Sequence, residues 1–416
     1  MSLLDPLFAR LIRKGQLTRI DTDGGSRTFG TPDPDFPDVT IRLHDRRVGL
    51  DILRKPTLGM AEAYMDGRVT IEAGDIWNLV SLFRANNPWE SGRSIETKGP
   101  VKRALKAVSK QFGRINDRAQ ARRNVKHHYD LSDRLYDLFL DRDRQYSCAY
   151  FTDPDNSLEQ AQADKKAHIA AKLALRPGQK ILDIGCGWGG MALYLHEKCG
   201  VDVLGVTLSE EQLKVARERA AAAGVADHVR FELIDYRDVG PALGAPFDRI
   251  VSVGMFEHVG VGNYRDFFRN CHNLLTPDGV MLLHTIGRMG KAKKTDAFTR
   301  KYTFPGSHVP SLSQMMQASE PNKLMVTDVE VLRLHYGLTL RRWYDRTVAA
   351  REQIEALYDA RFFRMWTLYL AGAAAGFDHG GTVNYQVQYA RSRHALPITR
   401  DYMMQAETAL RAASDS

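Results

Sequence analysis

The sequence predicts an α/β fold in which a doubly wound, mostly parallel sheet is joined to a small N-terminal domain. From Ser157 onwards, short apolar segments with strand character alternate with helical segments, and this alternation is typical of such a sheet. A glycine-rich turn, "GCGWGG", follows the first of these strands, at the place where folds of this class bind ligands. Residues 1–85 lack the alternation and contain turns such as "GTPDPDFPD", which indicates a small separate domain.

The elements of the main domain are expected from their apolar patterns and from helix start and stop signals. Ser209, for example, is placed to open one helix and Gly224 to close it. In chain order the expected elements are helix 157–175, strand 180–185, helix 191–200, strand 201–207, helix 209–224, strands 229–235 and 247–254, helix 263–275 and strand 280–287. We expect helices on both faces of the sheet and ligands at the C-terminal ends of the strands.

The rest of the chain is expected to divide into a few segments. Residues 86–123 should form a linker followed by a basic amphipathic helix, and residues 124–416 the catalytic domain. Within that domain the pattern loosens over about 288–344 into a Lys- and Met-rich insertion, which we expect to be a helical lid over an apolar pocket. Residues 351–377 are expected to be helical.

Composition limits the classes of protein to consider. The 416 residues are 44% hydrophobic and 26% charged, without an apolar run long enough to cross a bilayer and without an apolar segment after Met1. We therefore expect neither a membrane span nor a secretory signal, and a cytoplasmic location. The four cysteines are widely spaced and form no C-x-x-C, which argues against a zinc site and a disulfide framework.

The net charge of +8 favours an anionic partner, either nucleic acid or an anionic membrane surface. Nine Lys and Arg residues against the single Asp117 lie between Lys102 and Lys126. Their segment also carries an apolar helical stripe: Val101, Leu105, Val108, Phe112 and Ile115. Two interpretations stay open: a solvated helix packed on its own domain, or a helix lying on anionic lipid.

The glycine turn matches a dinucleotide fingerprint, Gly185-x-Gly187-x-x-Gly190, but its surroundings favour another ligand. Asp183, on the strand before it, would repel a pyrophosphate and could hold the ammonium group of S-adenosylmethionine. The longer pattern D-x-G-x-G-x-G, from Asp183 to Gly189, fits that ligand better.

The next two strand ends agree with this choice. The second strand ends near Thr207 and Gln212, which are neutral, whereas a dinucleotide fold usually has an acid there for the ribose. Glu210 and Glu211 are expected in the first turn of the following helix, where the helix dipole stabilises them. The third strand ends in Asp235-Tyr236, which suits the amino group and ring of adenine. We therefore favour S-adenosylmethionine over NAD.

Six stretches in order resemble the cyclopropane-fatty-acyl-phospholipid synthases, a family that includes the mycolic acid cyclopropane synthases. They are "HHYDLSDRLYDLFLDRDRQYSCAYF", "LDIGCGWGG", "GVTLSEEQ", "SVGMFEHVG", "LLHTIG" and "HYGLTLRRW", and "LGMAEAYMDG" resembles the N-terminal region of full-length bacterial members. The resemblance implies a Rossmann-like class I S-adenosylmethionine-dependent methyltransferase fold. It also implies transfer of a methylene group to the cis double bond of an acyl chain in a membrane phospholipid, peripheral association with the inner face of the membrane, and a homodimer.

The resemblance further implies the site residues. In this family the base that removes the proton before ring closure is a bound bicarbonate, and the matching positions here are Cys148, Glu257, His284, Ile286 and Tyr336. The matching positions for S-adenosylmethionine are Tyr129, Tyr146, Ser147, Asp183, Gly185, Gly187, Gly189, Thr207, Gln212, Asp235 and Tyr236. Without the motif, each of the four bicarbonate side chains could equally be an ordinary structural residue.

Several alternatives remain. The pair His127-His128 has no second ligand cluster in the sequence, so no metal is expected. Ala373 stands where the family often has a cysteine, which removes any scheme with that cysteine as nucleophile and leaves a changed product open.

The nearest rival function is that of a lipid C-methyltransferase that gives methyl-branched or methylated unsaturated chains. A nucleic-acid methyltransferase is less favoured because no N-P-P-Y-like motif or nucleic-acid module is present, and a non-catalytic lipid-binding protein is disfavoured by the retained site positions.

Overall fold

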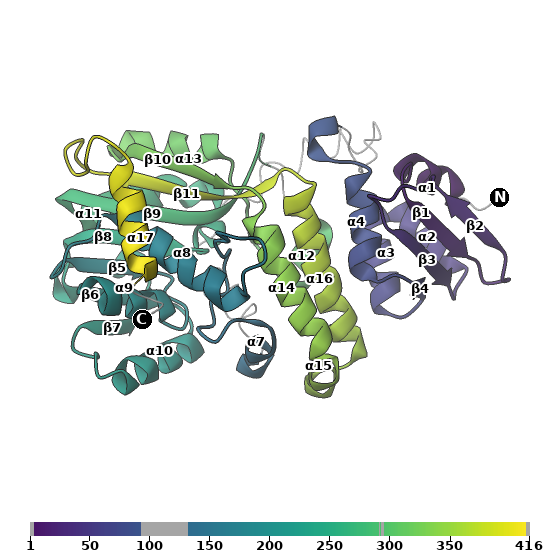
Figure 1. The fold of residues 1–416 in the computed structure, drawn as a ribbon, viewed down its shortest axis with the longest axis horizontal. Helices are drawn as coiled ribbons and strands as arrows, with labels where there is room; N and C mark the ends of the chain where they lie inside the picture. Colours follow the sequence, from purple (N-terminus) through teal and green to yellow (C-terminus); the bar gives the residue numbers. More distant parts are fainter. Residues whose placement is uncertain (1–3, 93–131, 291, 293–294, 413–416) are drawn as a thin grey trace. The chain divides into compact units, whose positions relative to one another are not determined.

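The computed structural model describes residues 4–92, 132–290, 292 and 295–412, and the chain forms two compact units. The first unit groups Met1–Gly113 with Thr295–Pro305 and Gly337–Gly381. The second groups Arg114–Lys294 with Gly306–Tyr336 and Thr382–Ser416. Figure 1 gives the helices and strands of each unit.

The second unit is built on a seven-stranded sheet with the order β10-β11-β9-β8-β5-β6-β7. The strands from β9 to β7 are parallel, whereas β11 runs antiparallel to β9 and β10 antiparallel to β11. Their bounds are β5 Lys180–Ile184, β6 Asp202–Thr207, β7 Val229–Leu233, β8 Phe247–Val253, β9 Leu275–Arg288, β10 Met325–Leu332 and β11 Thr382–Ala390. The chain leaves β5 for β6 on one side and later returns to β8 on the other, so a ligand crevice is expected between these strand ends.

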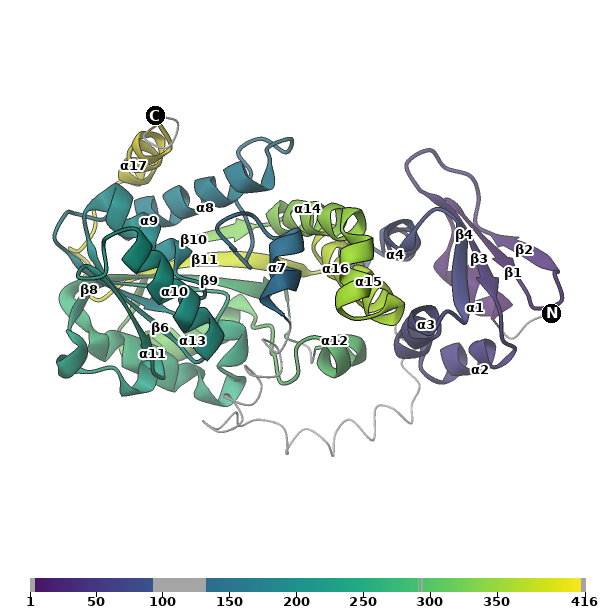
Figure 2. The same cartoon turned by 90° about the horizontal axis from the view of Figure 1, so that it is seen from below.

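Helices cover both faces of this sheet (Figure 2). Those of the second unit are α7 Asp133–Phe139, α8 Leu158–Leu173, α9 Gly190–Cys199, α10 Glu210–Ala222, α11 Tyr264–Leu274, α13 Leu312–Ser319 and α17 Asp401–Ala412. On β5, Ile181 belongs to the apolar core shared with α8 and α9, while Leu182 and Ile184 belong to the core shared with α11 and α13. Because side chains alternate along a strand, Asp183 shares the α8 side with Ile181.

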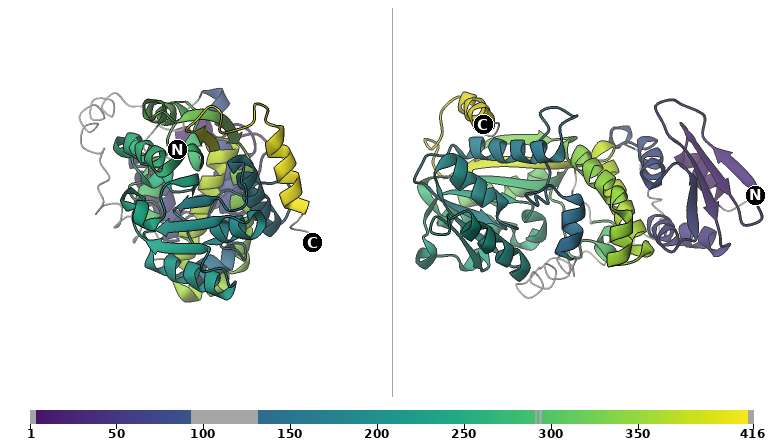
Figure 3. Two further views of the ribbon diagram at one scale, coloured as in Figure 1. Left: turned by 90° about the vertical axis from the view of Figure 1, so that its left-hand side faces the viewer. Right: turned by 60° about the horizontal axis from the view of Figure 1, so that its bottom comes forward.

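Helix α17 packs along α8 at the surface of the second unit (Figure 3). His168 of α8 joins the two helices and the sheet, since its Nδ1 lies 2.8 Å from Glu407 Oε2 and its Nε2 lies 2.7 Å from Glu330 Oε2. Burial alone would lower the pKa of His168, but the hydrogen bonds to both carboxylates raise it overall. The two carboxylates therefore favour the charged form of the imidazole.

The predicted alternation of strands and helices in this unit is confirmed, and so are the N-cap Ser209 and the position of Glu210 and Glu211 in the first turn of α10. The two antiparallel strands, β10 and β11, were not predicted. β10 has an edge position and a mostly half-buried sequence, "MVTDVEVL", so it lacks the apolar run that marks the other strands.

The first unit contains a four-stranded sheet with the order β2-β1-β3-β4. Its strands are β1 Gln16–Ile20, β2 Ser26–Phe29, β3 Asp38–Leu43 and β4 Val69–Ala73. Its helices are α1 Asp5–Leu11, α2 Arg47–Arg54, α3 Pro56–Met65, α4 Ile76–Ala85, α12 Ala297–Tyr302, α15 Arg351–Leu357, α16 Ala360–Asp378 and most of α14 His335–Ala349. The sequence segment expected to be helical over 351–377 is thus two helices, because the Asp359 side chain caps α16 by accepting from Phe362 N.

These units follow spatial contacts and not chain order, so they differ from the segments expected from sequence. Residues 337–381 group with the N-terminal residues, although they were assigned to the catalytic segment 124–416. The segment 288–344, expected as a lid, contributes β10 and α13 to the second unit and α12 to the first. A role as a lid stays a prediction, as does the basic helix within 86–123, which lies outside the described residues beyond Gly92.

Among the described helices, none is both long enough and apolar enough to cross a membrane.

Gly205 on β6 provides a test of this packing. A Cβ at this buried position would lie 2.5 Å from Phe231 Cδ1 and 2.9 Å from Cys186 Cβ, so Gly205→Ala should lower the free energy of unfolding by about 1 to 3 kcal/mol. Gly240→Ala is the matched control, because a Cβ there meets nothing within 4 Å, and it should change stability by less than about 0.5 kcal/mol. Urea unfolding of both variants measures the difference. Equal stability of the two variants would contradict the packing described here.

Candidate functional site

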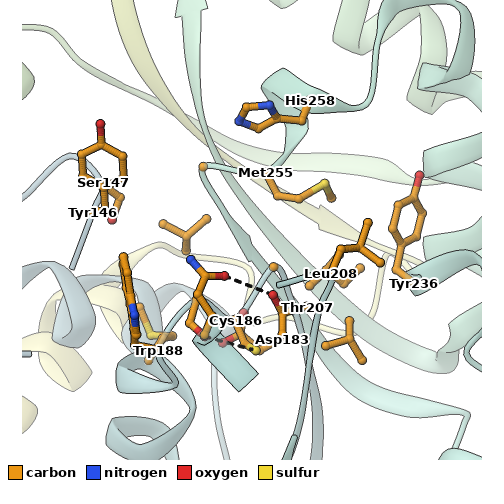
Figure 4. A pocket seen from close by; sticks show the side chains of 18 of the residues that line it. Tyr146, Ser147, Asp183, Cys186, Trp188, Thr207, Leu208, Tyr236, Met255 and His258 are labelled. Carbon is orange, nitrogen blue, oxygen red and sulfur yellow. Dashed lines mark hydrogen bonds between the residues drawn. The ribbon is translucent and has the colours of Figure 1, made fainter. Parts of the chain in front are cut away.

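A pocket lies at the C-terminal ends of β5, β6, β7 and β8, where the sheet topology predicts a ligand (Figure 4). Its walls come from the turn after β5, from the ends of the neighbouring strands and from the segment before α8. The lining residues are Arg144, Gln145, Tyr146, Ser147, Asp183, Ile184, Gly185, Cys186, Gly187, Trp188, Met191, Val206, Thr207, Leu208, Gln212, Ile234, Asp235, Tyr236, Arg237, Val253, Gly254, Met255, His258, Val259 and Asn263.

The glycine turn has a backbone that few other residues could adopt. Gly185 has a φ of 82° and Gly189 a φ of 84°, both in the left-handed region. A Cβ on Gly189 would also lie 2.7 Å from Phe231 Cζ. The turn leads directly into α9, whose N-cap is Gly189, so the first backbone N–H groups of this helix follow directly on the pocket-lining turn.

Asp183 brings a buried carboxylate to the pocket wall. It is 2% exposed, its Oδ2 has no hydrogen-bond partner within the described part of the chain, and burial raises its pKa to about 7. A buried carboxylate oxygen without a partner is costly unless a ligand supplies a donor. The geometry therefore suits a cationic group such as an ammonium.

Thr207 and Gln212 lie together at the end of β6 and the start of α10. Thr207 Oγ1 lies 3.1 Å from Gln212 Oε1, and the Ser209 side chain accepts from Gln212 N (Figure 4). The two side chains are neutral and buried, so they can exchange hydrogen bonds with hydroxyl groups of a ligand.

At the end of β7, Tyr236 presents its ring to the pocket while Asp235 is held by a neighbour. Arg237 donates from Nε to Asp235 Oδ1 at 2.8 Å and forms an ion pair with the same carboxylate. Tyr236 packs edge-on against Phe267, with ring centroids 5.4 Å apart. This end of the pocket thus offers an aromatic face beside a carboxylate whose position is fixed.

The predicted ligand residues can now be placed. Nine of them line this one pocket: Tyr146, Ser147, Asp183, Gly185, Gly187, Thr207, Gln212, Asp235 and Tyr236. Gly189 does not line it and serves instead as the N-cap of α9. Tyr129 lies outside the described residues.

Glu257 lies on the short 3-10 helix Phe256–His258, between two residues that line the pocket, Met255 and His258. Its Oε1 accepts from Ile286 N at 2.6 Å, and its Oε2 has no hydrogen-bond partner in the described ranges. Burial raises the pKa of Glu257 to about 7. Two predicted catalytic residues, Glu257 and Ile286, are therefore joined directly, and one buried carboxylate oxygen remains available.

His284 on β9 is fully enclosed by two amide side chains of β11. Its Nε2 lies 3.1 Å from the Asn384 amide and its Nδ1 lies 3.1 Å from Gln386 Nε2. Lys172 donates to Gln386 Oε1 at 2.9 Å, so the Gln386 NH₂ group must face His284, and Nδ1 is the acceptor. Nε2 then carries the proton and donates to Asn384 Oδ1, once that amide is turned.

The charge state of His284 follows from its surroundings. Burial lowers its pKa well below the usual value, and the nearby Lys165 and Lys172 lower it further. His284 is therefore neutral, and both of its nitrogens are engaged. A direct contact between His284 and an anion would require one amide of β11 to release it.

The remaining predicted catalytic residues are also buried. Cys148 is fully enclosed, with its Sγ 3.3 Å from Ala149 O, and Tyr336 is 9% exposed near the start of α14. None of the five predicted catalytic residues lines the pocket described above. Their grouping around one anion stays a prediction.

Sequence reasoning missed several pocket residues. Trp188 and His258 lie within motifs that were recognised, "GCGWGG" and "MFEHVG", but neither was assigned a role. Burial lowers the pKa of His258 to about 4, so this imidazole is neutral. The apolar wall residues, among them Leu208, Ile234 and Met255, give no sequence signal because apolar residues at strand ends are common.

One group of potential metal ligands exists among the described residues: His196, Asp202 and His228. The two imidazole rings are stacked, with centroids 5.1 Å apart and planes 17° apart. Imidazole lone pairs lie in the ring plane, so two stacked rings do not converge on one ion. His196 Nδ1 pairs with Val201 O, and His228 Nδ1 pairs with Asp202 Oδ1. These contacts connect neighbouring elements of the fold and do not form a metal site.

Comparison with known proteins adds a family assignment. The family model described as mycolic acid cyclopropane synthetase matches residues 116–387. The cyclopropane-fatty-acyl-phospholipid synthase of Escherichia coli K12 is 40% identical over 350 residues, which cover 84% of this chain and 87% of that protein. A probable fatty acid methyltransferase of Pseudomonas putida is 36% identical over 380 residues, covering 88% of this chain and 92% of that protein.

A solved structure agrees with the sequence match. The mycolic acid cyclopropane synthase CmaA1 complexed with SAH and CTAB is 35% identical, has a TM-score of 0.60, and covers 65% of this chain and 98% of its own. Both the sequence and the sheet of the second unit thus match that group of enzymes. The chain belongs to the mycolic acid cyclopropane synthetase family and is an S-adenosylmethionine-dependent methyltransferase with the class I fold.

Proposed function

We propose that this enzyme transfers a methylene group from S-adenosylmethionine to the cis double bond of an unsaturated acyl chain in a membrane phospholipid, forming a cyclopropane ring. The observation that carries the proposal is the position of Glu257. Its buried carboxyl group, with one oxygen unpaired, lies on the turn that also lines the ligand pocket through Met255 and His258. In this proposal the group that holds the base and the site of the methyl donor lie in neighbouring walls.

The donor would occupy the pocket with its amino-acid end at Asp183 and its adenine end at Tyr236. Tyr146 and Ser147 lie on one side of the pocket and Tyr236 on the other (Figure 4). S-adenosylmethionine bound in this way supplies an electrophilic sulfonium methyl group. The apolar residues Leu208, Ile234 and Met255 exclude water, which keeps the methyl group from hydrolysis and raises the strength of the polar contacts.

An alkene is a poor nucleophile, so the chain must hold it in line with the methyl group. The alkene carbon forms a bond to the methyl carbon as the carbon–sulfur bond breaks, and the positive charge then lies on the acyl chain. Loss of a proton from the new methyl group closes the ring. In this proposal Glu257 Oε2, which is buried and unpaired, accepts a hydrogen bond from the base that removes this proton.

The family's bound bicarbonate is part of this proposal. Glu257 fits it, since its free Oε2 can accept the hydrogen carbonate O–H. The hydroxyl of Tyr336 and the thiol of Cys148 could donate to the other oxygens. Hydrogen carbonate held there would supply the base for ring closure. His284 fits this role less directly, because the Asn384 and Gln386 amides engage both of its nitrogens.

A second product is supported by the similarity to the P. putida protein named a probable fatty acid methyltransferase. The same cation can lose a proton from the neighbouring chain carbon, and the product is then a methylated alkene. Which proton leaves depends on where the acceptor lies, so the two products differ only in the placement of the base.

Peripheral association with an anionic membrane, at its inner face, follows from a phospholipid substrate and is supported by α2. The exposed face of this helix carries Leu50 and Leu53, which are 47% and 39% exposed. Four exposed cations flank them: Arg46, Arg47, Arg54 and Lys55. The acids nearby, Asp45 and Asp51, form ion pairs with Arg68. An apolar strip with a basic rim suits anionic lipid.

The basic segment from Lys102 to Lys126 is proposed to add to this attraction, although it lies outside the described residues. The homodimer implied by the family resemblance is likewise part of the proposal, and the mass measured by light scattering tests it.

The product itself is the first test. Lipids from cells that produce the enzyme should gain one CH₂ per modified chain and lose the double bond, as mass spectrometry with double-bond derivatisation would show. Cells carrying Asp183→Asn, which lacks the donor-binding carboxylate, are the control. A CH₂ gain with the double bond retained would establish the methylated alkene instead. Unchanged lipids in both strains would contradict the proposed function.

Glu257→Gln tests the group that holds the base. Glutamine still accepts from Ile286 N, so the fold should persist, while turnover should fall about a hundredfold or more. Wild-type turnover should rise with pH through about 7, because the Glu257 carboxyl accepts a proton or hydrogen bond only when ionised. The variant should lose this pH dependence yet bind S-adenosylhomocysteine normally. Glu320→Gln, at an exposed site, is the control, and wild-type turnover in Glu257→Gln would refute the assignment.

Charge reversal on α2 tests the membrane surface. Arg47→Glu with Arg54→Glu should weaken binding to phosphatidylglycerol vesicles about tenfold or more at low salt, and the difference should shrink at high salt. Arg176→Glu with Lys180→Glu changes the net charge equally at another exposed place. Vesicle cosedimentation compares the two variants. Equal loss in both would show that total charge, and not α2, governs binding.

A further inference from the structure

Helix α8 places a buried lysine behind the pocket segment 145–147. Lys165 is fully buried, and its Nζ donates to Gln145 Oε1 at 2.6 Å and to Ser147 Oγ at 2.9 Å. Gln145 and Ser147 line the pocket, whereas Lys165 does not. Lys165 therefore acts on a ligand through the residues that it holds, and its charge also favours the ionised form of Asp183.

Helix α8 also donates hydrogen bonds to the backbone carbonyl groups of this segment. Gln162, one turn before Lys165, donates its side-chain amide to Gln145 O at 3.1 Å and to Ser147 O at 3.0 Å. An ammonium group can only donate, so Ser147 Oγ must accept from Lys165. The single hydroxyl hydrogen of Ser147 is then left to point elsewhere, towards an acceptor in the pocket.

The opposite chemistry is found at Asp183. Its unpaired Oδ2 can only accept when the group is ionised, and it lies in the same pocket. One wall therefore offers the Ser147 hydroxyl as a donor, held by the Lys165 ammonium, and the other wall offers the Asp183 carboxylate. An amino acid presents the complementary pair, a carboxylate and an ammonium, on one carbon atom.

We propose that Lys165 is a positioning residue for the methyl donor: held against Gln145 and Ser147, it orients the Ser147 hydroxyl towards the carboxylate of the donor's amino-acid end. The proposal rests on the proposed donor orientation. Asp183 holds the ammonium and Ser147 donates to the carboxylate, so the pair recognises the zwitterion and fixes which end of the donor lies there. Burial lowers the pKa of Lys165 to about 8, and nearby Asp141 opposes this change. The subsite is therefore charged at neutral pH and loses its charge as the pH rises through about 8.

The affinities of two ligands for the wild type and for the Lys165→Met variant test the subsite. S-adenosylhomocysteine carries both charges, and its decarboxylated analogue, with an aminopropyl group in place of the amino-acid end, keeps only the ammonium. Lys165→Met should weaken S-adenosylhomocysteine about tenfold or more by isothermal titration calorimetry, because a charge-assisted contact is lost. It should weaken the analogue clearly less, because the analogue loses only the electrostatic support that Lys165 gives to the Asp183 carboxylate. Equal loss for both ligands, or no loss for either, would overturn the proposal.

Lys172→Met is the matched control, since Lys172 is a second buried lysine of α8 whose Nζ pairs with Glu330 and Gln386. It should leave the ratio of the two affinities unchanged.

If Lys165→Met does not fold, Ser147→Ala keeps the lysine and should weaken only S-adenosylhomocysteine, by several-fold. Equal effects on both ligands in that variant would also overturn the subsite. In the wild type, the preference for S-adenosylhomocysteine should decline above pH 8. Failure of either ligand to bind the wild type would instead count against the proposed function itself.

Discussion

A carboxylate buried without a partner sets the character of the site. Asp183 ends up on the α8 side of β5 because side chains alternate along the strand, and the left-handed glycine turn that follows gives it no hydrogen bond for Oδ2. The energetic cost of this arrangement is offset only when a ligand brings a donor. The pocket is thus prepared for a cation, and the same feature disfavours a ligand with phosphates at the turn.

The rest of the second unit supports this arrangement from behind. Helix α8 makes three sets of contacts. Gln162 and Lys165 donate hydrogen bonds to the segment 145–147. Lys172 donates to the Gln386 amide of β11, and His168 connects α8 to β10 and α17. The amides of β11 in turn fix the tautomer of His284. Buried polar groups of this kind are stable only when almost all of their partners are present. Glu257 Oε2 and Asp183 Oδ2 are carboxylate oxygens beside the pocket to which this network gives no hydrogen-bond partner.

Much of the fold could be predicted because the parallel strands are apolar runs separated by clear helix signals. The antiparallel strand β10 could not, since its half-buried residues lack a run and its place in the sheet depends on pairing with β11, which lies far along the chain. The grouping of residues 337–381 with the N-terminal segment was also hidden, because sequence order carries no record of long-range packing.

The same division applies to the site. The glycine turn, Thr207, Gln212 and Tyr236 could be named from motifs at successive strand ends, since the fold class brings such ends together. Lys165 could not, because a lysine within a helix of mixed polarity is normally solvent-exposed and only packing shows it to be buried. The engagement of His284 by Asn384 and Gln386 was also out of reach, because it depends on the register between β9 and β11.

A crystal structure of the enzyme with S-adenosylhomocysteine tests the central claim most directly. The account predicts the ligand's amino nitrogen within hydrogen-bond distance of Asp183 Oδ2, its carboxylate at the Ser147 hydroxyl and its adenine against Tyr236. A ligand bound in the reverse direction, or one whose ammonium finds its partners elsewhere and leaves Asp183 unpaired, would contradict it.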